Sequence, residues 1–106
     1  MSLLSNLEIE EIIGELNGWD YSDGSIKKTF IFDTYMDSIN FINKLAEKAE
    51  EENHHPDMIV GWCKVGITFT SHDQGGVTAA CAKMAKQADL ITVSYTHLTL
   101  PTNREV

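Results

Sequence analysis

The chain has 106 residues, of which 42% are hydrophobic, and its sixteen acidic and eight basic side chains give a net charge of −8. This composition is typical of a single globular domain, and the acidic balance argues against a nucleic-acid surface, because phosphate binding needs clustered lysine and arginine. The sequence has no apolar run near the ~18 residues of a membrane helix and no signal-peptide pattern. We therefore expect a cytoplasmic protein without a membrane segment, in which Cys63 and Cys81 are reduced thiols.

The first third of the chain predicts a helix followed by a β-hairpin. A capping-box pattern begins at Ser5, and the apolar residues after it recur at helical spacing, which predicts a helix over residues 6–16. The Asp-Gly pair at 23–24 is typical of a tight turn, because it supplies positive φ angles. This turn separates a short strand near Trp19 from a second strand over 25–32. One face of the second strand carries Ile26, Lys28, Phe30 and Phe32.

A longer helix follows the hairpin. Asp33 or Thr34 can act as its N-cap, and Asn53 is positioned to end it. Helical periodicity predicts that one stripe of this helix faces the core. The stripe consists of Met36, Ile39, Ile42, Leu45, Ala46 and Ala49.

The remaining pattern predicts a second hairpin and a third helix. Strands are expected over 58–62 and 65–70. Thr78 can cap a third helix, in which Ala82, Ala85, Ala88 and Leu90 or Ile91 are available for packing. The resulting order α-β-β-α-β-β-α predicts an α+β fold, with a four-stranded antiparallel sheet and helices packed on one face. The other face, or an edge, is left for a partner chain.

The C-terminal segment differs from the rest of the sequence. Residues 93–106 show no helical or strand pattern tied to the preceding helix, and they resemble one translated frame of a common transposon-type sequencing adapter. We therefore expect one domain over 1–92, followed by a segment that is non-native or, alternatively, a disordered terminus. On this interpretation His97 has no functional role.

Three histidines are the main candidates for chemistry. His54 and His55 precede Pro56 in a predicted loop, and His72 follows the last predicted strand. Imidazole has an unperturbed pKa near neutrality, so histidines that meet in one pocket can give and take protons at pH 7. Glu50 lies one helical turn after Ala46, where it can face the histidines, hold an imidazole in one tautomer and raise its pKa.

The stretch Glu50 to Pro56, followed by Trp62, Thr70-Ser71-His72-Asp73 and Gly75 to Thr78, resembles the pterin-4a-carbinolamine dehydratase (4a-hydroxytetrahydrobiopterin dehydratase) family. The resemblance covers roughly residues 5–91. It implies dehydration of a 4a-hydroxytetrahydropterin to the quinonoid dihydropterin, which supports pterin recycling for aromatic amino-acid hydroxylases. No cofactor or metal is implied. Members of this family are homodimers or homotetramers.

The resemblance also implies roles for individual residues. His54 and His72 become the acid–base pair, and His55 mainly binds and orients the substrate. Further binding or orienting roles are expected for Glu50, Pro56, Trp62, Ser71 and Asp73. Two of these have a structural alternative, because Trp62 can be a core residue instead of a pocket wall, and Asp73 can cap the loop instead of binding the pterin.

One position departs from the family pattern. The family usually has an aspartate three residues after the threonine that starts the last helix, and this chain has Cys81 there. A thiol cannot replace a carboxylate in a reciprocal helix cap, so we expect a loss of about 1 kcal/mol in helix stability. This departure is expected to affect the helix start and not the histidines, and Cys63 is expected to serve packing only.

Two functions other than the dehydratase are compatible with parts of this pattern. Three histidines with Glu50 could form a zinc site, but adjacent residues in an extended segment point to opposite sides, which is poor geometry for shared chelation. The second alternative is a non-catalytic module of the same fold that binds or assembles other proteins, or acts as a transcription cofactor. Relatives that assist enzyme assembly generally lose catalytic histidines, and the retention of all three here favours the enzyme.

Overall fold

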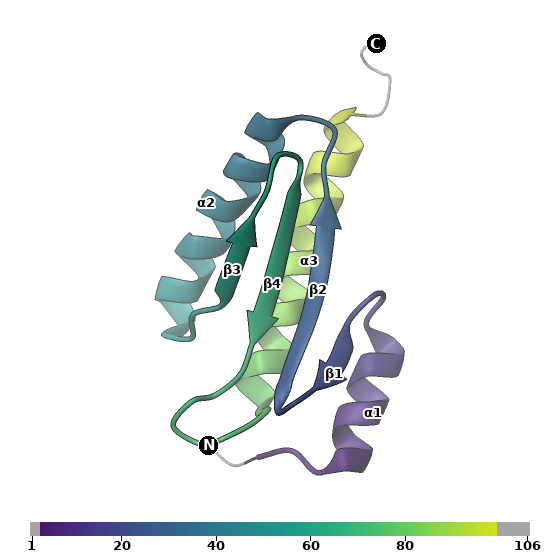
Figure 1. Ribbon diagram of the computed structural model, residues 1–106, viewed down its shortest axis with the longest axis vertical. Coiled ribbons are helices and arrows are strands. Elements are labelled where there is room, and N and C mark those ends of the chain that lie inside the picture. Colours follow the sequence, from purple (N-terminus) through teal and green to yellow (C-terminus); the bar gives the residue numbers. More distant parts are fainter. Residues whose placement is uncertain (1–2, 100–106) are drawn as a thin grey trace.

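The computed structural model describes residues 3–99 of the chain. Its elements are α1 (Asn6–Glu15), β1 (Asp20–Ser22), β2 (Ser25–Ile31), α2 (Tyr35–Glu52), β3 (Asp57–Val60), β4 (Lys64–Phe69) and α3 (Ala79–Thr99). The strands form one antiparallel sheet in the order β1-β2-β4-β3. Figure 1 shows α2 and α3 side by side across one face of the sheet, and α1 beside β1. The predicted α+β fold and element order are confirmed.

Local signals form the helix boundaries as the sequence predicts. The Ser5 hydroxyl accepts the Glu8 backbone N–H at 3.2 Å, and the Glu8 carboxylate accepts the Ser5 N–H at 2.8 Å, which completes the capping box. Of the two candidate caps of α2, Thr34 is the one used, and its hydroxyl accepts the Asp37 N–H at 3.0 Å. These bonds satisfy N–H groups that have no partner within the first turn of a helix.

The inner face of the sheet carries the expected apolar side chains. Ile26 and Phe30 of β2 pair directly with Phe69 and Val65 of β4, and all four are buried. Because successive strand residues point to opposite faces, this register directs one apolar set toward α2 and α3.

The buried stripe of α2 differs from the predicted one. The structure buries Ser38, Phe41, Leu45 and Ala49, whereas Met36 is 59% exposed. The rings of Phe30 and Phe32 lie 4.9 and 5.2 Å from that of Phe41, measured between centroids, so this aromatic cluster determines which side of α2 faces the sheet. Leu45 and Ala49 are buried as predicted, but the prediction included the exposed Met36 and omitted Phe41.

The third helix is longer than the sequence predicts. It begins at Ala79, directly after Thr78 as expected, and it continues to Thr99, into the segment from Val93 where the sequence shows no helical pattern. The segment Val93–Thr99 contains no glycine or proline, so backbone hydrogen bonding can propagate through it. The rest of the C-terminal segment lies outside the described residues, and its non-native origin stays a prediction. Within residues 3–99, no helix is long and apolar enough to cross a membrane.

Candidate active site

The histidine pair is positioned by the end of α2. Asn53 adopts a left-handed conformation with φ 52°, which ends the helix, and the His54 N–H then donates to the Ala49 carbonyl at 3.0 Å. Asparagine is among the few residues that adopt this conformation readily. The chain leaves the helix within one residue, so His54 and His55 occupy the short connection between α2 and β3.

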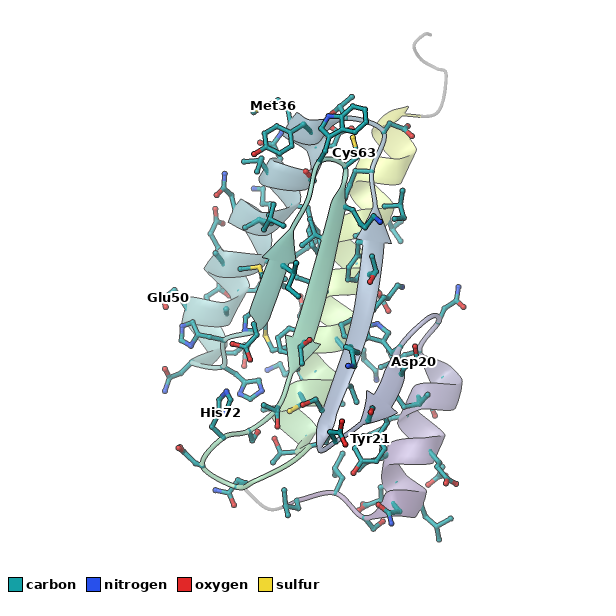
Figure 2. The ribbon with its side chains drawn as sticks, in the orientation of Figure 1. Asp20, Tyr21, Met36, Glu50, Cys63 and His72 are labelled. Carbon is teal, nitrogen blue, oxygen red and sulfur yellow. The ribbon has the colours of Figure 1, made fainter. Side chains whose placement is uncertain are left out.

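The third histidine comes from the loop between β4 and α3. The Ser71 N–H donates to the Gly76 carbonyl at 2.8 Å, and the Gly75 N–H donates back to the Ser71 carbonyl at 2.8 Å. Gly75 has a φ of 79°, which favours glycine. This compact turn holds His72 at the end of the sheet where α2 finishes. Figure 2 shows His72 and Glu50 at that end, and Cys63 at the opposite end.

All three histidines line one open pocket of about 330 Å³. This volume lies within the roughly 300–1,000 Å³ range that is usual for small-molecule sites. The other lining residues are Glu52, Asn53, Thr70, Ser71, Asp73, Gln74 and Ala80. The pocket is therefore built from the end of α2, the loop after β4 and the start of α3.

His54 is the least exposed of the three rings. It stacks on Phe69, with ring centroids 6.0 Å apart and planes inclined by 16°, and its Nε2 lies 3.3 Å from the Cys81 sulfur. Burial lowers the pKa of His54 below 6.5, and the positive charges of His55 and His72, when they are protonated, lower it further. The neutral imidazole of His54 is consequently favoured at pH 7.

The other two histidines each lie beside a carboxylate. The Nε2 of His55 is 2.5 Å from the Glu50 carboxylate, to which its N–H donates, and the Nε2 of His72 is 4.0 Å from the Asp57 carboxylate. A carboxylate accepts hydrogen bonds only, so Glu50 selects the tautomer of His55 that carries hydrogen on Nε2. Glu50 thus faces the histidines, and its partner is His55.

The remaining predicted site residues fall into two groups. Ser71 and Asp73 line the histidine pocket, and Pro56 connects His55 to β3. Trp62 lies elsewhere, since it occupies the β3–β4 turn, is 79% exposed and lines a separate hollow with Ile31 and Ile59. Within this chain, Trp62 is neither a wall of the histidine pocket nor a core residue.

Cys81 is the site residue that the sequence interpretation missed. The sequence predicts a role for residue 81 in the helix cap, and α3 still begins at Ala79. The structure also places its buried thiol against His54, a contact that the sequence interpretation did not include. The reason is that residue 81 faces inward from the first turn of α3, toward the end of α2. The sequence signal that could have identified Cys81 as a site residue is that it replaces the usual aspartate of the family, three residues after Thr78.

The histidines do not assemble into a cation-binding geometry with their neighbours. In the part of the chain that the structure describes, no three His, Cys, Asp or Glu side chains are grouped so that they could hold a metal ion. His54 is directed to Cys81, whereas His55 is directed to Glu50. The arrangement is instead suited to proton transfer and hydrogen bonding in a small polar pocket.

Relatives of known name cover most of the chain. Residues 2–91 match the sequence model of the family described as pterin 4 alpha carbinolamine dehydratase. A relative from Sulfurisphaera tokodaii is 37% identical over 84% of this chain and 96% of its own length. Another, from a Roseiflexus species, is 41% identical over 83% of this chain and 95% of its own length. Both carry the provisional name pterin-4-alpha-carbinolamine dehydratase.

Solved structures agree with these sequence matches. A transcriptional coactivator/pterin dehydratase from Brucella melitensis superposes with a TM-score of 0.83 at 29% identity, covering 85% of this chain and 98% of that one. A pterin dehydratase-like protein, described as a RuBisCO assembly factor in the alpha-carboxysome, shares the fold with a TM-score of 0.59 at 24% identity, over 69% of this chain and 84% of that one. From the family match and these relatives we conclude that the chain belongs to the pterin 4 alpha carbinolamine dehydratase family.

Proposed function

We propose that this protein dehydrates a 4a-hydroxytetrahydropterin to the quinonoid dihydropterin by histidine acid–base catalysis. The observation that supports this most directly is the meeting of His54, His55 and His72 around one pocket of about 330 Å³. In the reaction the bond between C4a and the hydroxyl oxygen breaks, the hydroxyl leaves as water, and the pterin ring loses one proton. A general acid and a general base are sufficient, because the ring nitrogens supply the electron pair that expels the hydroxyl.

His54 and His72 act as the acid–base pair in this proposal. Both line the pocket, and they come from different segments of the chain, His54 from the connection after α2 and His72 from the loop after β4. One protonates the departing hydroxyl and the other accepts the ring proton, and each such step typically contributes about 10²–10⁴-fold. After the reaction the base releases its proton to water and the acid takes one up, which restores the starting protonation states of both histidines.

His55 binds and orients the substrate, and Glu50 positions His55. We expect Glu50→Gln to raise KM about fivefold with a smaller change in kcat, because a neutral amide holds the imidazole less strongly than a carboxylate does. Glu51→Gln is the matched control, since Glu51 contacts Lys48 and not a histidine. Equal kinetic effects of the two substitutions would contradict the positioning role of Glu50.

The rate is expected to fall as the pH is lowered from about 8 to about 5, because the catalytic base must be unprotonated. Burial holds the pKa of His54 below the usual range of an imidazole, so its neutral form persists into mildly acidic solution. A pH profile of kcat/KM, with circular dichroism at each pH to verify folding, measures this. A rate that stays flat over the whole range would contradict histidine acid–base catalysis.

The direct test of the proposed function is an assay with chemically generated 4a-hydroxytetrahydropterin. The purified protein is added, and the appearance of the quinonoid product is followed by its ultraviolet absorbance against the uncatalysed reaction. We expect clear acceleration at catalytic protein concentrations. If the folded wild-type protein gives none, the enzymatic proposal fails, and the alternative of a non-catalytic assembly or transcription-cofactor module is favoured.

We also propose that the protein is a homodimer or homotetramer. β3 is an edge strand of the sheet, and its side chains Met58, Ile59 and Val60 are 36%, 81% and 47% exposed. An exposed apolar edge strand is a template for pairing with another chain. Sedimentation velocity is expected to give a dimer or larger species, and Ile59→Lys is expected to shift it toward monomer. A wild-type monomer at tens of micromolar would contradict this proposal.

A further inference from the structure

The Cys81 thiol lies against the most buried catalytic candidate. Cys81 is fully buried, and its sulfur is 3.3 Å from the Nε2 of His54. The sulfur is also 3.6 Å from the Ser71 hydroxyl and 3.9 Å from the Thr78 hydroxyl. Within the described residues, Cys81 is the only group that hydrogen-bonds to the His54 ring. This contact occupies Nε2, so Nδ1 is the ring nitrogen left for a ligand. The direction of the hydrogen bond to the thiol therefore decides whether Nδ1 donates or accepts.

The direction of these hydrogen bonds follows from Thr78. Its hydroxyl is fully buried, so its hydrogen must be donated to an acceptor, and the nearest is the Ser71 oxygen at 2.7 Å. Ser71 accepts this bond and can donate its own hydrogen to the Cys81 sulfur or toward the pocket. In the reverse direction, Thr78 would have only the Cys81 sulfur, at 3.9 Å, as an acceptor among the described residues.

The thiol hydrogen then has one good acceptor. The Nε2 of His54 is the closest polar atom to the sulfur, and an unprotonated imidazole nitrogen is a much better acceptor than a hydroxyl that already accepts from Thr78. A neutral imidazole has one nitrogen that donates and one that accepts. If Nε2 accepts the thiol hydrogen, the hydrogen of the ring is on Nδ1.

We propose that Cys81 is a positioning residue that holds neutral His54 in the tautomer protonated at Nδ1. The thiol does not touch the substrate, because it is fully buried beneath the His54 ring. It acts through the ring, which presents an N–H donor to a ligand in the pocket. The effect on catalysis rests on the proposed dehydratase function, but the tautomer itself does not.

A carboxylate at this position would have the opposite effect. The aspartate that the family usually has here can only accept a hydrogen bond when it is ionised, so it would require hydrogen on the Nε2 of the same histidine. The negative charge would also favour the imidazolium and raise the pKa of His54. A cysteine at position 81 therefore gives His54 the opposite hydrogen-bond polarity to the one that an aspartate in the same place would impose.

Nitrogen-15 NMR of the imidazoles tests the tautomer without any assay of activity. Chemical shifts of Nδ1 and Nε2 are measured near pH 8, where the lowered pKa of His54 keeps this ring neutral, with His54→Gln used to assign the His54 signals. We expect hydrogen on Nδ1 of His54 in the wild type and in Cys81→Ser, whose hydroxyl can also donate. In Cys81→Ala and Cys81→Asp we expect the hydrogen to move toward Nε2, with a higher His54 pKa in Cys81→Asp.

Cys63→Ser is the matched control, because Cys63 lies at the other end of the sheet and its sulfur contacts the Asp33 carbonyl at 3.8 Å. It should leave the His54 signals unchanged. A wild-type His54 with hydrogen on Nε2, or a Cys81→Ala variant with an unchanged tautomer, would overturn the proposal. If the buried aspartate prevents folding, Cys81→Ala still tests the polarity, because its side chain cannot donate a hydrogen bond.

The kinetic arm separates this proposal from the dehydratase proposal. We expect Cys81→Ala to lower kcat about tenfold, because the variant lacks the hydrogen bond that orients the His54 ring. Cys81→Ser is expected to retain most of the wild-type rate. A tautomer that shifts while kcat stays unchanged would overturn the positioning role in catalysis. A wild-type protein without dehydratase activity would overturn the proposed function, and the NMR result would still decide the tautomer.

Discussion

Replacement of His72 or His54 by alanine is expected to lower kcat/KM for 4a-hydroxytetrahydropterin by about 10²–10⁴-fold, because each substitution removes one of the two proton-transfer groups. His72 is 77% exposed in its side chain and lies in a loop, so His72→Ala removes chemistry with little effect on packing. His54 stacks on Phe69, and His54→Gln is the better variant there because it fills more of the same space.

A double variant that combines His54→Gln with His72→Ala tests the same prediction in a second way. If the two rings act in one proton-transfer event, the combined loss is expected to be smaller than the product of the single losses, because groups that act as a unit are non-additive. The matched control is His97→Ala, since residue 97 lies outside the 2–91 stretch that matches the family. A His72→Ala variant with wild-type kcat/KM would contradict the assigned pair.

Phe41→Ala is expected to reduce the free energy of unfolding by about 3–5 kcal/mol, because it empties a fully buried site of an aromatic ring. Phe41 joins β2 to α2 through the rings of Phe30 and Phe32, so the variant weakens the contact between helix and sheet. A domain of this size has a total stability of roughly 5–15 kcal/mol. Urea denaturation monitored by circular dichroism measures the loss.

Met36→Ala is the control that distinguishes the observed side of α2 from the predicted one. Met36 is 59% exposed, so its truncation is expected to change stability by less than about 0.5 kcal/mol. If the stripe inferred from periodicity were correct, Met36 would be the costly position and Phe41 the tolerant one. That reversed order of the two denaturation midpoints would contradict the packing of α2 in this structure.

Much of the secondary structure follows from local signals. The capping box at Ser5, the Thr34 cap and the Asn53 helix end depend on bonds within three to five residues, and each forms as the sequence predicts. The alternation along β2 and β4 likewise predicts which strand face is buried, because a strand has only two faces. A helix has a continuous circumference, and this is why the predicted stripe of α2 contained the buried Leu45 and Ala49 but also the exposed Met36, and lacked Phe41.

The sequence by itself determined the order of the elements and the identity of the three histidines, because these depend on residue type and spacing along the chain. Only the tertiary structure decided which distant residues surround those histidines. It placed the Cys81 thiol against His54, brought His72 into the same pocket as His54 and His55, and separated Trp62 from that pocket. The physical reason is that such contacts depend on how helices and strands pack across the core, which brings together residues far apart in sequence whose local patterns carry no information about one another.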